Sequence, residues 1–279
     1  MAKTITERFT LYDESVVIDF YPTSHRYKLI SVDGVEKKEW LASPSSVVNK
    51  LDKSRPLMSW AVNTFEETMI AHMRDGANFT KDDVLAMLKI SKGAYNERKQ
   101  EAADVGSVVH DFAEHNRSDI NEVEQFAELS DEDKKLAQQG VDAFNEWKKI
   151  MSPTFISNEF KVYSKRWNYV GICDALAEIG GELYIVDYKT SKGVYTSQVY
   201  QIAAYMKAYE EMTGKKVAGA KIVNFTKDDI TDKDDNIIRK AGSYMTHTVS
   251  RGELVTSFKA FKALLDVHRI DPVIAKTLK

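Results

Sequence analysis

The sequence predicts an α/β (α+β) fold in which a central mixed β-sheet is flanked by helices, with an N-terminal helical cap. Two observations predict it. The chain is helical in texture from Pro44 to about Ile150 and strand-like after Pro153, and the later part runs as three strands, a helix, a fourth strand and a last helix. This order gives a mixed sheet covered by helices. With 279 residues and no repeats, the chain suits one large domain or two interleaved lobes.

The composition fits a globular protein with a sizeable core, at 43% hydrophobic and 29% charged residues. No apolar run reaches the roughly 18 residues of a membrane span, and the segment MAKTITERFTLYDES has no signal-like apolar stretch. The single cysteine, Cys173, excludes an internal disulfide, a cysteine-held zinc site and an iron–sulfur cluster. We therefore expect an intracellular, cytoplasmic protein with no membrane partner.

The net charge constrains how the chain could bind nucleic acid. A formal charge of −3 excludes a protein whose whole surface attracts nucleic acid electrostatically. A local basic channel, or binding through metal ions, remains open.

The first 150 residues predict short strands and then helices. Strands are expected within 9–32, where SVVIDFY and HRYKLISV flank a turn-like Pro22-Thr23-Ser24. SPSSVVNKL and TKDDVLAMLKIS offer Ser and Thr caps to helices, and GSVVHDFAEHN and DEDKKLAQQGVDAFNEWKKI predict two more. In LMSWAVNTFEETMIAHM, Trp60 and a Met/Phe stripe recur at helical spacing. We expect this stripe in the core, with a lining for a nucleic-acid strand as the alternative.

After Pro153 the predicted strands are TFISNEFKVYS, YVGICDALAEI, ELYIVDYKT and VAGAKIVNFT. The third and fourth are separated by a helix, TSQVYQIAAYMKAYEEMTG, which Gly214 ends. DDITDKDDNII predicts a charged loop or hairpin, and GELVTSFKAFKALLDVH a final helix.

Gly180-Gly181 predicts a tight turn between two strands. If the turn is symmetric about this pair, Leu176 faces Ile185 and Asp174 faces Asp187; a loop of odd length would place the two aspartates on a diagonal. Two opposed carboxylates repel each other, and their burial costs free energy. A Mg²⁺ or Mn²⁺ ion that bridges them would compensate both effects.

Lys189 follows on the face of Asp187, where an ammonium can stabilise charge that develops on a phosphate. The alternative is that the two aspartates are exposed charges at strand ends, with Lys189 an ordinary salt-bridge partner.

The D…D-x-K arrangement of Asp174 and Asp187-Tyr188-Lys189 resembles the PD-(D/E)XK nuclease superfamily. GSVVHDFAEH resembles the G-[TS]-x-x-H-x-x-x-E helix of RecB-type nucleases, and GICDALAE, IVDYKTSK and QIAAY resemble their next three motifs, in the same order. FYPTSHRYKL and WLASPSSVVNKLDKSRPLMSWAVN are similar to phage-encoded members, themselves similar to mitochondrial genome maintenance exonucleases.

The resemblance implies a restriction-endonuclease-like core and roles for individual residues. One or two Mg²⁺ or Mn²⁺ ions would be held by side chains and a carbonyl, namely His110, Asp174, Asp187 and the backbone carbonyl of Tyr188. Lys189 would position or activate the attacking water, and Asp174, Asp187 and Lys189 form the catalytic set. Gln201 and Tyr205, one helical turn apart, would orient Lys189 or contact the scissile strand.

Several of these residues have ordinary alternatives. His110 on its own suits a packed or surface histidine, and only its motif favours a ligand. Glu114 is equally a partner of His110 or a solvated helix charge. Glu159 could approach the site or face outward, and Tyr205 could be core packing.

The resemblance implies a metal-dependent DNA exonuclease acting on single-stranded DNA or DNA ends, in phage recombination, replication or repair. The alternatives are a structure- or sequence-selective endonuclease and a catalytically silent DNA-binding or assembly protein on the same scaffold. Beyond DNA, a recombinase or a single-strand-binding protein is a candidate partner. Three parts are expected to form one interleaved domain: 1–43, an N-terminal β-hairpin region; 44–150, helical with the His motif; and 151–279, the core sheet and C-terminal helix.

Overall fold

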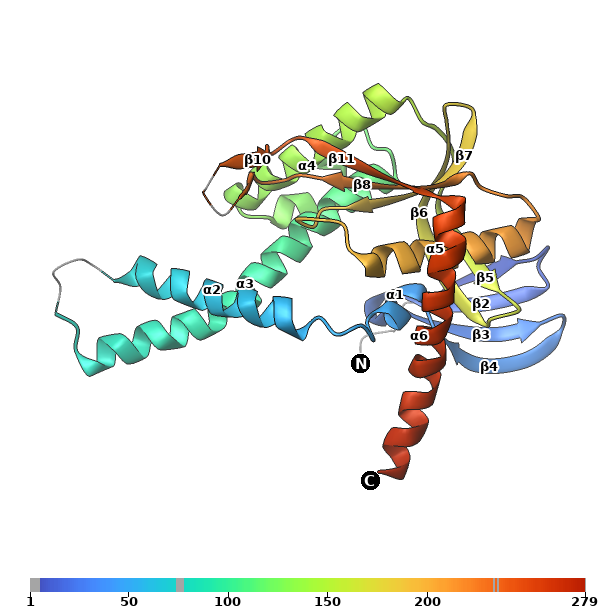
Figure 1. The fold of residues 1–279 in the computed structure, drawn as a ribbon, viewed down its shortest axis with the longest axis horizontal. Helices are drawn as coiled ribbons and strands as arrows, with labels where there is room; N and C mark the ends of the chain where they lie inside the picture. The colour runs from blue at the N-terminus through green and yellow to red at the C-terminus, as the bar shows by residue number, and fades with distance from the viewer. Residues whose placement is uncertain (1–5, 74–77, 233, 235, 279) are drawn as a thin grey trace.

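The structure is a computed structural model that describes residues 6–73, 78–232, 234 and 236–278. Two sequence predictions fall partly outside the described residues. The N-terminal segment that lacks a signal-like stretch includes residues 1–5, and the predicted charged loop includes Lys233 and Asp235. Two larger sheets and six helices make up most of the described part, and α2 (Ser54–His72) with part of α3 (Lys81–Glu114) projects from it as an arm (Figure 1).

Four strands form an antiparallel meander at the N-terminus. They are β1 (Glu7–Leu11), β2 (Val16–Tyr21), β3 (Arg26–Val32) and β4 (Val35–Leu41), in the order β1-β2-β3-β4. The strands extend beyond the predicted 9–32 because Asp33-Gly34, both at positive φ, make a hairpin turn to β4. Their apolar face, which includes Ile18 and Leu29, packs on Tyr163 and Val170 of the main body.

The central sheet has the order β11-β8-β7-β6-β5. Its strands are β5 (Thr154–Ser164), β6 (Tyr169–Ile179), β7 (Glu182–Lys189), β8 (Gly219–Phe225) and β11 (Tyr244–Ser250). β7 and β8 run parallel and the other neighbours antiparallel, which confirms the mixed sheet. Helix α5 (Thr196–Thr213) makes the crossover that a parallel pair requires. The edge strand β11 was not predicted, because its sequence YMTHTVS is mostly polar.

Helices cover both faces of this sheet. On one face, α1 (Pro44–Val48), α5 and α6 (Arg251–Thr277) bury a core that includes Ile185 and Ile222. On the other, α3 (Lys81–Glu114) and α4 (Asp131–Met151) pack on Val186, Tyr188 and Phe225. Of the described helices, none is long and apolar enough to cross a membrane.

Helix α2 (Ser54–His72) and the first half of α3 project from the body as a hairpin arm (Figure 1). The two helices predicted within 80–116 are one helix of 34 residues. Trp60 is 37% exposed, so the expectation that this residue belongs to the core is wrong. Helical periodicity reports an apolar face but does not say whether another element covers it.

The remaining elements are short. Strands β9 (Ile230–Thr231) and β10 (Ile237–Arg239) form a small hairpin, within the predicted charged segment. Single 3₁₀ turns span Pro22–Ser24, Ile120–Glu122 and Glu124–Glu128.

Gly140 of α4 sets the spacing between α4 and α3. A Cβ added there would lie 2.6 Å from Cγ2 of the buried, β-branched Val109. Gly140→Ala should therefore lower the free energy of unfolding by about 1–3 kcal/mol through overpacking, despite the higher helix propensity of alanine. Thermal unfolding checks this, with Gly252→Ala as control because only Ser250 Oγ, at 4.0 Å, lies near its added Cβ. Equal melting temperatures for wild type and Gly140→Ala would contradict it.

Candidate active site

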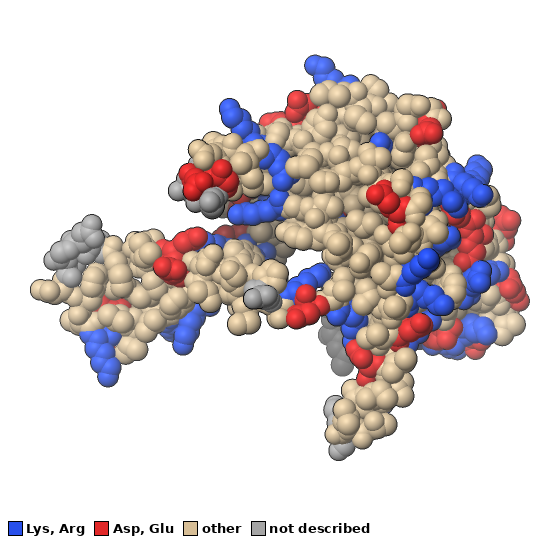
Figure 2. Space-filling view, viewed as in Figure 1, with Lys and Arg blue, Asp and Glu red and all other residues tan. Residues whose placement is uncertain are grey.

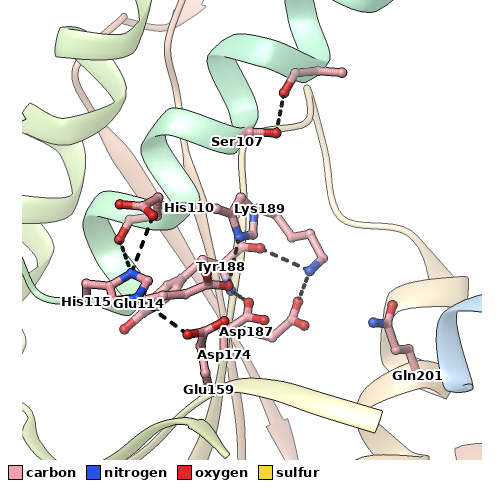
Figure 3. Close-up of polar contacts among 12 residues, drawn as sticks. Ser107, His110, Glu114, His115, Glu159, Asp174, Asp187, Tyr188, Lys189 and Gln201 are labelled. Atoms are coloured by element: carbon pink, nitrogen blue, oxygen red, sulfur yellow. Dashed lines mark hydrogen bonds and ion pairs between the residues drawn. The ribbon is translucent and has the colours of Figure 1, made fainter. Parts of the chain in front are cut away.

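The predicted residues meet where β7 ends beside β6 and the C-terminal part of α3 (Figure 3). The hairpin β6–β7 has the predicted register, with Leu176 opposite Ile185 and Ile179 opposite Glu182. Gly180 and Gly181 both have positive φ, as a two-residue turn of this kind requires.

The ladder stops one pair short of the aspartates, at Ala175 opposite Val186. Asp174 and Asp187 are therefore not a hydrogen-bonded strand pair. Instead, the backbone N–H of Tyr188 donates to Oδ2 of Asp174 at 2.7 Å. The Asp174 side chain thus holds the end of β7, and its second oxygen is left to other partners.

Side-chain alternation breaks at Asp174. Cys173 packs in the core under α5 and α6, whereas Ala175 packs in the core under α3 and α4. Glu159, between the β5 residues that pair with Ala175 and Cys173, has φ +44°. A non-glycine residue in this region is strained, and such strain often marks functional sites. Because of this break, Ile172 packs with the N-terminal sheet whereas Leu176 packs in the core under α5 and α6, although strict alternation would place both on one face.

Lys189 lies at the centre of the polar contacts. Its Nζ is 2.5 Å from Oδ2 of Asp187 and donates to the Tyr188 carbonyl oxygen at 3.0 Å. The Asp187 side chain is 2% exposed, and beyond this ion pair its buried Oδ2 has no hydrogen bond within the described structure. Two of the predicted ligand groups, Asp187 and the Tyr188 carbonyl, therefore both contact the lysine ammonium.

His110, Glu114 and Asp174 form a second group. Each offers one ligand atom, and these atoms lie within 4.8 Å of one another. His110 Nδ1 is 3.6 Å from Glu114 Oε1, one helical turn away. Glu114 thus partners His110 and is not an isolated surface charge.

Burial dominates the electrostatics of this site. Desolvation raises the pKa of Asp174 against the opposing effects of Lys189 and His110. Desolvation, with a contribution from Asp174, raises the pKa of Asp187 to about 6. Desolvation opposes charge on Lys189 and His110, but the carboxylates outweigh it and raise the pKa of both. A cluster of this kind accepts positive charge readily.

Two motif glycines allow the elements to approach closely. A Cβ on Gly106 would lie 3.0 Å from Thr190 Oγ1, next to Lys189. A Cβ on Gly171 would lie 2.6 Å from the Tyr205 ring and 3.1 Å from Pro44. Without side chains at these positions, α3 packs on the end of β7 and α5 packs on β6.

Gln201 and Tyr205 form a pair on α5, in which Gln201 Nε2 donates to the Tyr205 hydroxyl at 2.8 Å. Tyr205 is 5% exposed and belongs to the core, so only Gln201 reaches the surface of the site. Gln201 and Lys189 line a groove of about 550 Å³ between α5 and the α1–α2 connection. Within the described residues, neither Gln201 nor Tyr205 hydrogen-bonds Lys189.

One residue near the site escaped sequence analysis. His115 Nε2 lies 3.5 Å from Glu159 Oε2, and its Nδ1 lies 3.6 Å from Asp111 Oδ2 (Figure 3). It directly follows the motif residue Glu114, but no spacing rule links it to Glu159 on a distant strand. Glu159 therefore faces His115, and its side chain is 46% exposed.

Comparison with known proteins decides the family. Residues 85–265, which include His110, Asp174, Asp187, Lys189 and Gln201, match the sequence model of the PD-(D/E)XK nuclease superfamily. The chain belongs to the PD-(D/E)XK nuclease superfamily. A crystal structure from Eubacterium rectale, provisionally described as an exonuclease, matches at 15% identity over 64% of this chain and 73% of the other, with a TM-score of 0.41. At that TM-score the likeness carries no argument. No curated protein matches the chain.

PD-(D/E)XK nucleases generally use divalent metal ions, and the residues present fit one. The Asp187 carboxylate is 2% exposed at the end of β7, and His110, Glu114 and Asp174 converge on one place. Carboxylate oxygens suit Mg²⁺ and Mn²⁺, and an imidazole ligand favours Mn²⁺.

The raised pKa of Asp187 predicts a pH-dependent stability difference in the metal-free protein. Its folded-state pKa of about 6 lies above the ordinary 3.8, so the stability due to the neutral carboxyl is present below pH 3.8 and lost as the pH rises through about 6. The melting temperature of wild type minus that of Asp187→Asn should therefore fall between about pH 4 and pH 7. Thermal unfolding in EDTA measures it; a constant difference would show that Asp187 titrates normally.

Proposed function

We propose that this protein is a Mg²⁺- or Mn²⁺-dependent deoxyribonuclease that degrades single-stranded DNA from an end. The observation that carries the proposal is the buried Lys189–Asp187 ion pair, in which Lys189 lines the groove and Asp174 and His110 lie near enough to Asp187 to influence its pKa. Buried, mutually perturbed acids and a lysine in a cleft are typical of catalytic sites. Superfamily membership supports phosphodiester hydrolysis as the reaction.

The proposed ligands are Asp174, Asp187, His110 and the Tyr188 carbonyl, with Glu114 next to His110. A divalent ion at such a site supplies a Lewis acid and lowers the pKa of water. The Tyr188 N–H fixes one oxygen of Asp174, which restricts the orientation of that carboxylate.

Lys189 is proposed to orient the attacking water and to stabilise the charge that develops on the phosphate. Its ammonium lines the groove, and its raised pKa keeps it protonated at neutral pH. Gln201, held by the Tyr205 hydroxyl, lines the same groove and can donate to a phosphate oxygen. Glu159 is proposed to act through His115, and not as a direct ligand.

The arm supports an end-dependent mode of action. Figure 2 shows an opening between the arm and the body, and the groove lies between the base of α2 and α5. A free single strand can pass such an opening more easily than a closed duplex. Trp60 on the arm is 37% exposed, and its ring offers a surface for base stacking.

The motif set also supports the narrower assignment to RecB-type, phage-encoded nucleases similar to mitochondrial genome maintenance exonucleases. We infer on that ground a role in DNA recombination, replication or repair. The division into 1–43, 44–150 and 151–279 within one interleaved domain belongs to the same proposal.

Substitutions of the ion pair test the site. Lys189→Ala should lower kcat for Mn²⁺-dependent DNA cleavage by about 100- to 1000-fold, since it removes a preorganised donor, and Asp187→Asn should lower it at least as much. Cleavage of end-labelled DNA measures both. Lys192→Ala is the matched control, because this lysine is exposed three residues further along the chain. Unimpaired cleavage by either site variant, with the fold intact by circular dichroism, would refute the assignment.

Circular single-stranded DNA tests the mode of action. An obligate exonuclease degrades the linear strand and leaves a circle of the same sequence intact, which is the expected result with Mg²⁺ or Mn²⁺. Cutting of the circle would instead indicate an endonuclease. Failure to cut any DNA with Mn²⁺ would indicate a catalytically silent DNA-binding protein.

A further inference from the structure

A second cavity, of about 370 Å³, lies on the other side of α1 from the active-site groove. It is enclosed by β3 and β4 of the N-terminal meander, the start of α1 and the C-terminal half of α6, which meet at the lower right of Figure 1. Ser43 and Ser46 line this cavity, whereas Ser45 and Val48 line the groove. The short helix α1 therefore lies between the two.

The lining combines an aromatic surface with positive charge. Trp40 is 49% exposed, and the guanidinium of Arg26 lies 3.9 Å from its ring centre. Arg269 enters from α6, and no Asp or Glu is found among the described residues that line the cavity. Aromatic rings bind nucleobases by stacking, and arginines bind phosphate oxygens.

Several donors in the cavity are not used by the protein itself. Arg26 stacks on Trp40 but makes no hydrogen bond or ion pair within the described structure. Nδ1 of His268 is buried without a partner. Arg269 donates through one terminal nitrogen to the Trp167 and Asn168 carbonyls, which leaves its other N–H groups free to bind. By contrast, the Ser43 and Ser46 side chains are engaged in capping α1.

Two carboxylates near the cavity contact groups other than Arg26 and Arg269. Glu39 accepts from Asn168 Nδ2, and Asp271 pairs with Lys50 at 2.7 Å. An anion in the cavity therefore meets unneutralised cationic groups from both β3 and α6. The combination of a stacking surface, cationic donors and a volume of this size suits a nucleotide.

We propose that this cavity is a second nucleotide-binding site, in which Trp40 stacks on a base and Arg26, Arg269 and His268 contact the adjoining phosphate of the same single strand that enters the groove. The identity of the ligand as DNA rests on the proposed function; the nucleotide chemistry rests on the cavity alone. A strand that occupies both sites crosses only α1, so the cavity would hold the substrate a short distance from the bond to be cut.

Binding of a fluorescently labelled oligothymidylate of about ten nucleotides, measured by anisotropy in EDTA so that the strand stays intact, tests the site. Trp40→Ala should raise the Kd at least about fivefold, which corresponds to the lower end of one base stack, and Trp40→Phe should recover part of the loss. Arg26→Ala should weaken binding similarly. Arg166→Ala is the matched control, because this exposed arginine also stacks on a tryptophan, Trp167 at 4.9 Å, but lines neither cavity.

Unchanged Kd values for Trp40→Ala and Arg26→Ala, with circular dichroism confirming the fold, would overturn the proposal. An equal loss in Arg166→Ala would also overturn it, because the effect would then be general electrostatics. Competition with dAMP distinguishes a nucleotide of the strand from a free mononucleotide. If the oligothymidylate stays bound in the presence of dAMP, the cavity binds a nucleotide of the strand, as proposed. If dAMP at a concentration comparable to that of the oligothymidylate displaces it, the cavity binds a free mononucleotide and the assignment is overturned. Trp40-dependent binding by a protein that cuts no DNA would sink the proposed function but leave the cavity assignment standing.

Discussion

Charge buried at the end of one strand is the constraint on which the rest of this structure depends. Asp187, 2% exposed, is tolerated beside Asp174 because the Lys189 ammonium contacts it at 2.5 Å. Asp174, Asp187 and Lys189 compensate one another's charges in this buried position. Removal of one of them leaves another charge buried and unpaired, which destabilises the fold. The Tyr188 N–H bond to Asp174 ties the set to the backbone. The same arrangement that neutralises these charges in the free protein is suited to receiving a divalent ion and a phosphate.

The surrounding fold serves to bring distant segments to that strand end. The parallel pair β7–β8 requires the α5 crossover, which places Gln201 at the groove. Gly106 lets α3 approach Thr190, so that His110 and Glu114 reach Asp174 from the opposite side of the sheet. Asn224 on β8 donates to the Lys189 and Ser191 carbonyls and thereby fixes the chain just after the lysine. The site is thus held by rigid elements on three sides, as preorganised chemistry requires.

Much of the site followed from local sequence, and the failures have identifiable causes. The Gly180-Gly181 turn fixed the hairpin register, because a two-residue turn leaves no freedom to slip. The break in alternation at Asp174 could not be foreseen, since it depends on the strained backbone of Glu159 on a neighbouring strand. The exposure of Trp60 was missed because periodicity does not show whether a face is covered. The second cavity joins Trp40 to His268 across most of the chain; Trp40 lies in a segment quoted for the resemblance and His268 does not, and only the fold brings the two together.

The central claim is that the buried carboxylates form a metal site, and Mn²⁺ anomalous scattering from crystals soaked in the ion tests it most directly. The account predicts an anomalous peak bounded by the Asp174 and Asp187 carboxylates and the His110 ring, absent from crystals of Asp174→Ala. A well-ordered structure at saturating Mn²⁺, in which these side chains contact only Lys189 and one another and no peak lies between them, would contradict it.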